Sequence, residues 1–134
     1  MVINLLGLDI GGSRIGIARV NMSARLPEPL GTYKNDEFFL DSLKSLIKEH
    51  QIDTLVIGLP RNMQGQETAQ SNYVRDFCKS TIEPLGLKIL WQDETLSSVE
   101  AVKRLGARKY HKSDIDSQAA GIILEDYLKG SVNI

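Results

Sequence analysis

Hydrophobic residues gather in short runs along this chain, and the first two runs lie close together. Residues 2–10 and 15–20 are rich in Val, Ile and Leu without a helical period, and Gly11 and Gly12 separate them. Such runs predict two strands joined by a tight turn. A third, shorter strand is expected at 30–33. Pro27 precedes it, and we expect an edge strand because proline cannot donate to a central ladder.

The pattern then changes to helical spacing. A helix is predicted from Asp36 to about His50, with Asn35 or Asp36 as its N-cap. Its apolar face is expected to contain Phe39, Leu43, Leu46 and Ile47.

Two further strands are predicted at 54–58 and 87–92, on either side of a second helix. The loop 59–65 contains proline and glycine, which forbid regular structure. The helix is predicted at 68–82 and is stopped by 84–86, which reads Pro-Leu-Gly. Its expected apolar stripe is Ala69, Tyr73 and Phe77.

Two sequences resemble capping boxes and predict two more helices. Residues 97–100 (SSVE) follow Glu94 directly, and residues 113–116 (SDID) open the last helix. Asp116 is therefore expected in a first helical turn. The buried face of this last helix is predicted to be Ile115, Ala119, Ile122, Ile123 and Tyr127.

The predicted order is three strands, helix, strand, helix, strand, helix, helix. It indicates an α/β fold with a mixed five-stranded sheet, antiparallel among its first three strands and parallel after them, flanked by helices on both faces. A chain of 134 residues fits a single domain spanning 1–134.

Composition narrows the function classes. The net charge of -1, from 16 basic and 17 acidic residues, means that nucleic acid would have to bind a local basic patch. Cys78 is the only cysteine, so an internal disulfide and a CxxC motif are excluded, and it is expected to pack in the interior. With no charged leader and no apolar run of about 20 residues, we expect a cytoplasmic protein without a membrane partner.

Three acidic residues stand where strand ends or a helix start would bring them together. Asp9 ends the first apolar run, Glu94 ends the fifth, and Asp116 opens the last helix. Ligands of open α/β sheets gather at the carboxyl ends of strands. A cluster of three carboxylates could share two divalent ions, and ligation by oxygen alone favours Mg²⁺ or Mn²⁺. We therefore expect Asp9, Glu94 and Asp116 to be both metal ligands and catalytic residues of a phosphodiester nuclease.

Simpler interpretations exist for two of these acids. Asp116 could serve only to stabilise its helix through the helix dipole, and Glu94 could be a solvated residue at a strand end. Asp9 is harder to explain in that way, because the glycines that follow it allow a backbone to approach a phosphate closely.

A cluster of basic residues lies between Glu94 and Asp116 in the sequence and should border the same site. It comprises Lys103, Arg104, Arg108, Lys109 and Lys112. Such a run is often only a solvated surface, but it could position a polynucleotide through its phosphates. His111 is a weaker candidate, as a proton donor to a leaving oxygen.

Four blocks of the sequence resemble the YqgF family, the bacterial RNase H-like group to which Holliday junction resolution and pre-16S rRNA processing are attributed. The blocks are 6–18 (LGLDIGGSRIGIA), 56–65 (VIGLPRNMQG), 93–101 (DETLSSVEA) and 112–128 (KSDIDSQAAGIILEDYL). The resemblance implies an RNase H-like fold and a hydrolase that uses Asp9, Glu94 and Asp116 as catalytic acids. Arg14, Arg61 and Asn62 are added to the basic cluster as candidate nucleic-acid contacts.

The sequence also departs from the family pattern. Gly12 and Ser13 stand where the family commonly has Thr and Lys, and Thr95 replaces an arginine. The lost basic residues bear on substrate affinity and choice, whereas all three acids are retained.

Several functions stay open at this point. Processing of the 5′ end of pre-16S rRNA, with the ribosomal subunit as a possible partner, is placed ahead of resolution of branched DNA. The sequence does not separate the two, because a basic patch fits either substrate. Residues 8–13 also resemble the first phosphate loop of actin-like kinases and ATPases, whose two lobes need a longer chain. A non-catalytic nucleic-acid or ribosome-binding module is the third possibility.

Overall fold

The apolar runs become the strands of one mixed sheet. The computed structural model describes residues 3–94 and 112–132, and within them the five strands have the order β3-β2-β1-β4-β5. The antiparallel pairs are β1 with β2 and β2 with β3, and the parallel pairs are β1 with β4 and β4 with β5. This confirms the predicted sheet. Its strands are β1 (Asn4–Ile10), β2 (Arg14–Asn21), β3 (Glu28–Lys34), β4 (Thr54–Pro60) and β5 (Lys88–Glu94).

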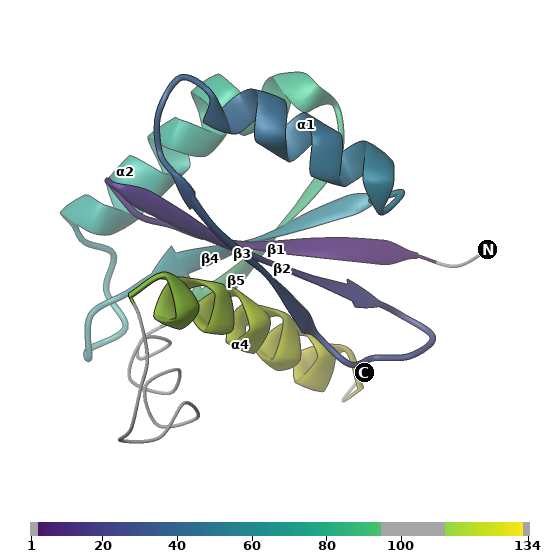
Figure 1. Cartoon of the computed structure of the whole chain (residues 1–134). Helices are drawn as coiled ribbons and strands as arrows, with labels where there is room; N and C mark the ends of the chain where they lie inside the picture. Colours follow the sequence, from purple (N-terminus) through teal and green to yellow (C-terminus); the bar gives the residue numbers. More distant parts are fainter. Residues whose placement is uncertain (1–2, 95–111, 133–134) are drawn as a thin grey trace.

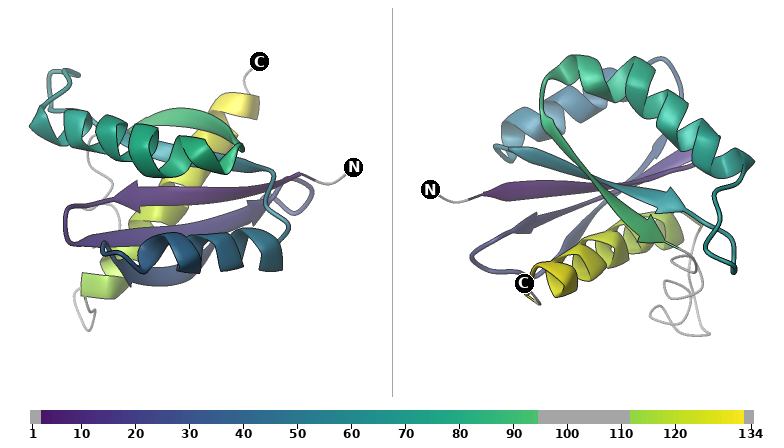
Figure 2. Two further views of the ribbon diagram at one scale, coloured as in Figure 1. Left: turned by 90° about the horizontal axis from the view of Figure 1, so that it is seen from above. Right: turned by 180° about the vertical axis from the view of Figure 1, so that it is seen from behind.

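Helices cover both faces of the sheet, as predicted. Figure 1 shows α1 (Phe39–Glu49) and α2 (Ala69–Phe77) above the sheet and α4 (Lys112–Val132) below it. The views in Figure 2 show α4 running obliquely across its face of the sheet. The helix predicted from 97–100 lies outside the described residues. None of the described helices combines the length and the apolar character that crossing a membrane requires.

Strand alternation divides the interior into two cores. On β1, Leu6 and Leu8 point toward α1 and α2, whereas Leu5 packs with Ala120 and Leu124 of α4. Side chains two apart on a strand share a face, so Asp9 lies on the α4 side with Leu5. By the strand pairing, the even-numbered residues of β2, β4 and β5 also face α4.

Glycines in three neighbouring strands let α4 approach the sheet closely. A Cβ at Gly7 would lie 2.7 Å from Leu124 Cγ, and one at Gly58 would lie 2.4 Å from Ile123 Cδ1. A Cβ at Gly16 would meet the backbone carbonyl oxygen of Asp116 itself. A side chain at Gly16 would therefore force α4 away from the sheet, and one at Gly7 or Gly58 would crowd the side chains that α4 packs against it.

The predicted N-cap of the first helix is wrong. Helix α1 begins at Phe39, and the residue before it makes no side-chain capping bond. Asp36 Oδ1 instead accepts from the Phe38 N–H at 2.9 Å, and Asn35 Nδ2 donates to the Gly11 carbonyl at 2.8 Å. Asp36 thus bonds within the loop before the helix and Asn35 bonds to the turn between β1 and β2, so neither side chain caps α1.

The predicted apolar stripe of the second helix is also wrong in part. Tyr73 and Ala69 are exposed, whereas Ser71, Val74 and Cys78 are buried. Ser71 Oγ donates to the Pro60 carbonyl at the end of β4, and the face of the helix that contains Ser71 and Val74 packs toward the sheet. The helix continues through one π turn (Cys78–Ile82) and a 3-10 turn (Glu83–Leu85) to a left-handed Gly86, close to the predicted end.

Helix α4 begins earlier than the sequence predicts. It spans Lys112–Val132 in the described part of the chain, so Ser113 lies inside the helix and Asp116 in its second turn. Its buried face also includes Ala120 and Leu124, which sequence periodicity missed because the strand glycines allow contact over a wider arc. The helix dipole falls off within the first turn, so it gives a weaker account of Asp116 than the prediction allowed.

Candidate active site

Asp9 is a half-buried carboxylate at the carboxyl end of β1. It lies opposite Gly16 of β2 on the face that α4 covers. Burial, reinforced by the nearby charge of Asp116, raises the pKa of Asp9 from 3.8 to about 6. A cation beside it would remove that penalty.

Asp116 is held by β2 at two points. Its backbone carbonyl lies against Gly16, and its carboxylate oxygen Oδ2 accepts from Arg14 Nε at 2.7 Å. Arg14 and Gly16 are alternate residues of one strand and share a face. Asp116 is therefore fixed beside Asp9, although 107 positions separate the two acids in the sequence.

Glu94 approaches the same place from the other side of β4. It is the last residue of β5, pairs with Pro60, and its backbone carbonyl accepts from the Arg61 N–H at 3.0 Å. Its Oε1 is buried, and its Cγ lies 3.7 Å from the position that a Cβ on Gly58 would take. In the parallel register Leu8 of β1 pairs with Ile57 of β4, so Gly58, the next residue, lies level with Asp9. The Glu94 side chain therefore extends back along the sheet toward the level of Asp9.

The three acids occupy one end of one face of the sheet, but not as a finished set of ligands. Within residues 3–94 and 112–132, no three acidic, histidine or cysteine side chains are grouped closely enough to hold one metal ion. Asp9 and Asp116 are the pair that meets. Two carboxylates in electrostatic contact, with a third on the same face, fit a hard divalent cation such as Mg²⁺ or Mn²⁺ chemically. The catalytic and metal-binding roles of Asp9, Glu94 and Asp116 remain predictions.

The loop after β4 holds its own polar residues together. Arg61 Nε lies 2.9 Å from Asp93 Oδ1, and Asn62 Oδ1 accepts from the backbone N–H groups of Gln64 and Gln66 at 3.0 and 2.9 Å. Asp93 is therefore an ion-pair partner of Arg61. Arg61 and Asn62 stiffen the loop that borders Glu94, and their contact with nucleic acid stays a prediction.

The basic cluster is largely beyond what the structure describes. Lys112 opens α4, and the other four cluster residues and His111 lie outside the described residues, as do Thr95 and the 97–100 box. Their positions relative to the acids stay a prediction.

Sequence reasoning missed two structural residues of the site. Gly16 and Gly58 sit inside strands, where glycine is normally unfavourable, and an interior strand glycine often marks close backbone approach. That signal was available in the sequence, but what approaches each glycine could be learned only from the fold.

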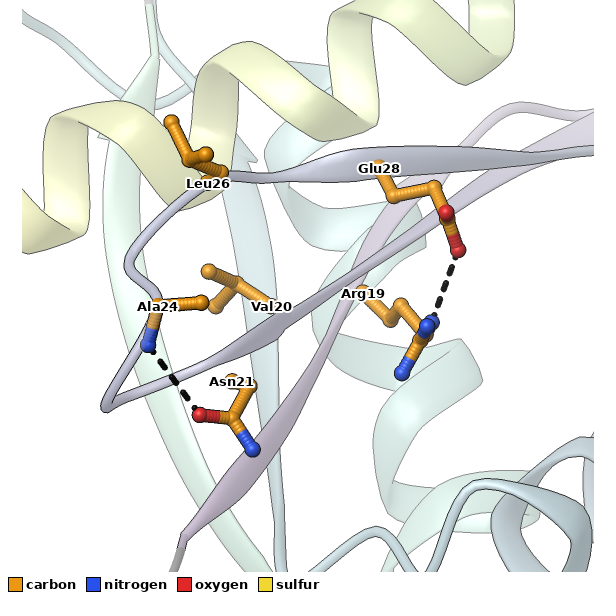
Figure 3. Close-up of a pocket in the computed structure, with 6 residues that line it drawn as sticks. All are labelled: Arg19, Val20, Asn21, Ala24, Leu26 and Glu28. Carbon is orange, nitrogen blue, oxygen red and sulfur yellow. Dashed lines mark hydrogen bonds and ion pairs between the residues drawn. The ribbon is translucent and has the colours of Figure 1, made fainter.

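A small pocket lies at the other end of β2. Figure 3 shows its lining, including Arg19 and Glu28, whose ion pair measures 2.8 Å, and Leu26. Its volume of about 100 Å³ is below the roughly 300 Å³ typical of small-molecule sites. The pocket lies well along β2 from Gly16, the residue that pairs with Asp9.

Comparison with known proteins identifies the family. The family model RuvX, described as Holliday junction resolvase, matches residues 3–130. The chain belongs to the RuvX family. This confirms the resemblance to YqgF-type proteins that the sequence motifs indicated.

Relatives of this RuvX protein carry a second functional name. A protein of Synechocystis sp., 39% identical over 92% of this chain and 85% of its own length, is named "Putative pre-16S rRNA nuclease". A relative from Lactococcus lactis subsp. cremoris, 35% identical over 96% of this chain and 95% of its own length, carries the same name. The names of these relatives agree with the predicted enzyme class, a nuclease.

Solved structures confirm the RNase H-like fold predicted from the motifs. Thermus thermophilus RuvC in complex with a Holliday junction substrate superposes with a TM-score of 0.58, covering 97% of this chain and 96% of that one. A second Thermus thermophilus RuvC structure gives a TM-score of 0.54. At 10% and 8% sequence identity, the likeness is one of fold.

Proposed function

We propose that this RuvX protein is a metal-dependent nuclease that hydrolyses phosphodiester bonds in structured nucleic acid, with the 5′ end of pre-16S rRNA as its substrate. The observation that carries the proposal is the meeting of Asp9 and Asp116, from β1 and α4, at the carboxyl end of the sheet. A half-buried carboxylate next to a second one costs stability unless a cation compensates it, which is a reason to expect function there.

Each acid has a distinct task in this proposal. Asp9 is the central ligand, since it lies between β2, which holds Asp116, and β4, over which Glu94 extends. Asp116 and Glu94 complete the ligand set from its two sides. The metal ions they hold would activate the attacking water and stabilise the leaving oxygen. The chain positions the carboxylates and excludes water from one side of them through the packing of α4.

Resolution of branched DNA is the second candidate. The description of the RuvX family favours it, whereas the names of the relatives from Synechocystis sp. and Lactococcus lactis favour pre-16S rRNA. Both substrates are recognised largely through phosphates and shape, so the acidic site serves either. Pre-rRNA bound to the ribosomal subunit, in the cytoplasm, is the partner and setting we propose for the first candidate.

The experiment uses both substrates with one protein. A 5′-extended pre-16S leader duplex and a four-way DNA junction are each incubated with the protein in Mn²⁺, in Mg²⁺ and in EDTA. We expect cleavage of the leader duplex that requires the ions and is absent from the Asp9→Asn variant. Cleavage of the junction alone would establish the second candidate, and tight binding without cleavage of either would show a non-catalytic module.

The other two acids give a test of the ligand set. Glu94→Gln and Asp116→Asn are each expected to lose most activity, on the order of 100-fold or more, because ligands of one cluster act as a unit. For the same reason the double variant should be little worse than either single variant. Rates are measured under single-turnover conditions, with Asp114→Asn as the control that stays near wild type. Small additive losses would assign both acids peripheral roles.

The basic cluster gives a test of substrate binding. Replacing Arg108, Lys109 and Lys112 by alanine should weaken binding of the leader duplex and of a random duplex about equally, because phosphate contacts carry no sequence information. Each lost contact should remove about 0.7 to 0.9 from the slope of log affinity against log salt. Affinities are measured across a salt series for wild type and triple variant. Coincident slopes would mean that the cluster does not contact the substrate.

A further inference from the structure

Asp116 already carries a cation in this structure, the guanidinium of Arg14. The Nε–Oδ2 distance is 2.7 Å, and the two side chains are 36% and 20% exposed. Solvent and salt screen a partly buried ion pair less than a fully exposed one. The contact joins β2 to α4 across 102 positions of sequence.

The pair lies within the ligand set of the proposed function, and the inference rests on that function. Asp116 borders Asp9 closely enough that its charge raises the pKa of Asp9. Arg14 engages Oδ2 of Asp116, and among the described residues no three potential ligands are grouped for one ion. The carboxylate of Asp116 is thus oriented by the guanidinium of Arg14.

We propose that Arg14 is a positioning residue whose guanidinium neutralises Asp116 in place of a metal ion, and that a divalent cation must displace this guanidinium to bind Asp116. Before the metal binds, the guanidinium neutralises Asp116 and holds its carboxylate at the site. A divalent ion held by Asp116 would repel the guanidinium of Arg14, because two cations cannot share a partly buried carboxylate without a Coulombic cost. The guanidinium that is released bears five N–H donors suited to a phosphate of the substrate.

Displacement has a measurable consequence for metal affinity. Breaking the ion pair is part of the cost of binding the metal, so removing Arg14 should make the metal bind more tightly. An ion pair that is partly exposed contributes up to about 1 kcal/mol, which corresponds to about a fivefold change in a binding constant. We therefore expect Arg14→Gln to bind Mn²⁺ about fivefold more tightly than wild type. Arg14→Lys keeps the charge without the planar fork, and should fall between the two.

The chain offers a matched control on the same strand. Arg19 of β2 is 35% exposed and makes an Nε ion pair of 2.8 Å with Glu28, yet it faces away from α4. Arg19→Gln should therefore lose an equivalent ion pair and leave the affinity for Mn²⁺ unchanged.

The experiment is calorimetric titration of the nucleic-acid-free proteins with Mn²⁺, accompanied by circular dichroism to establish that each variant is folded. Tighter binding by Arg14→Gln, with Arg19→Gln like wild type, supports displacement. Equal or weaker binding by both Arg14→Gln and Arg14→Lys overturns it. Absence of Mn²⁺ binding by the wild-type protein would instead refute the proposed function, so the two failures are distinguishable.

Discussion

Replacing Asp9 by asparagine is expected to abolish cleavage and, at the same time, to stabilise the metal-free protein at neutral pH. The two effects have one cause, since a half-buried carboxylate beside Asp116 costs free energy until a cation binds it. Asparagine has nearly the same shape and no charge. It removes the cost together with the metal ligand.

The pH dependence follows from the raised pKa. Below pH 3.8 Asp9 is protonated in both the folded and the unfolded chain and contributes nothing. Between pH 3.8 and about 6 the unfolded chain releases its proton first, so the free energy of unfolding of the metal-free protein falls as the pH rises. The full difference amounts to about 3 kcal/mol. The stability gained in Asp9→Asn should therefore be present above pH 6 and vanish below pH 4.

Denaturant unfolding in EDTA at several pH values measures this difference, and cleavage of the leader duplex in Mn²⁺ measures the activity. Asp126→Asn, which removes another half-buried carboxylate from α4, is the control expected to retain activity. An Asp9→Asn protein that still cleaves at the wild-type rate would remove Asp9 from the catalytic set. A variant that is less stable than wild type at pH 7 would contradict the electrostatic cost.

Replacing Gly16 by alanine is expected to separate Asp116 from Asp9 and to lower both stability and activity. The added Cβ would overlap the Asp116 carbonyl oxygen, and a backbone atom of a long helix cannot move aside as a flexible side chain could. Overpacking of a core usually costs about 1 to 3 kcal/mol, and we expect a loss at the upper end of that range. Activity should fall on the order of 100-fold, because a displacement of about 1 Å costs that much at a catalytic site.

Gly12→Ala is the matched control for this variant. Gly12 precedes the same strand, is exposed, and has no atom within 4 Å of its would-be Cβ. It should behave as wild type in denaturant unfolding, because its added Cβ meets no other atom. If Gly16→Ala is equally active and stable, the close approach of α4 does not set the geometry of the site. If it is stable but inactive, the effect of the glycine is confined to the position of Asp116.

The sheet was predictable because its signals are local. The apolar runs, the glycine pair at 11–12 and the proline before β3 specified five strands and their mixed topology. Helix boundaries were less predictable, since neither Asn35 nor Asp36 caps α1: Asn35 donates to Gly11 in the turn between β1 and β2, and Asp36 accepts from Phe38 in the loop. The stripe of α2 was misplaced because Ser71 bonds to Pro60, a contact that periodicity does not encode.

The sequence by itself determined the family, the sheet and the candidate acids Asp9, Glu94 and Asp116, because motif order and hydrophobic period are properties of the chain alone. Only the tertiary structure decided how those acids are held. The ion pair of Arg14 with Asp116 and the raised pKa of Asp9 arise only when segments far apart in the sequence pack together, which brings the charges close and buries Asp9. The strand glycines set that distance, since only a residue without a side chain lets α4 bring Asp116 against β2.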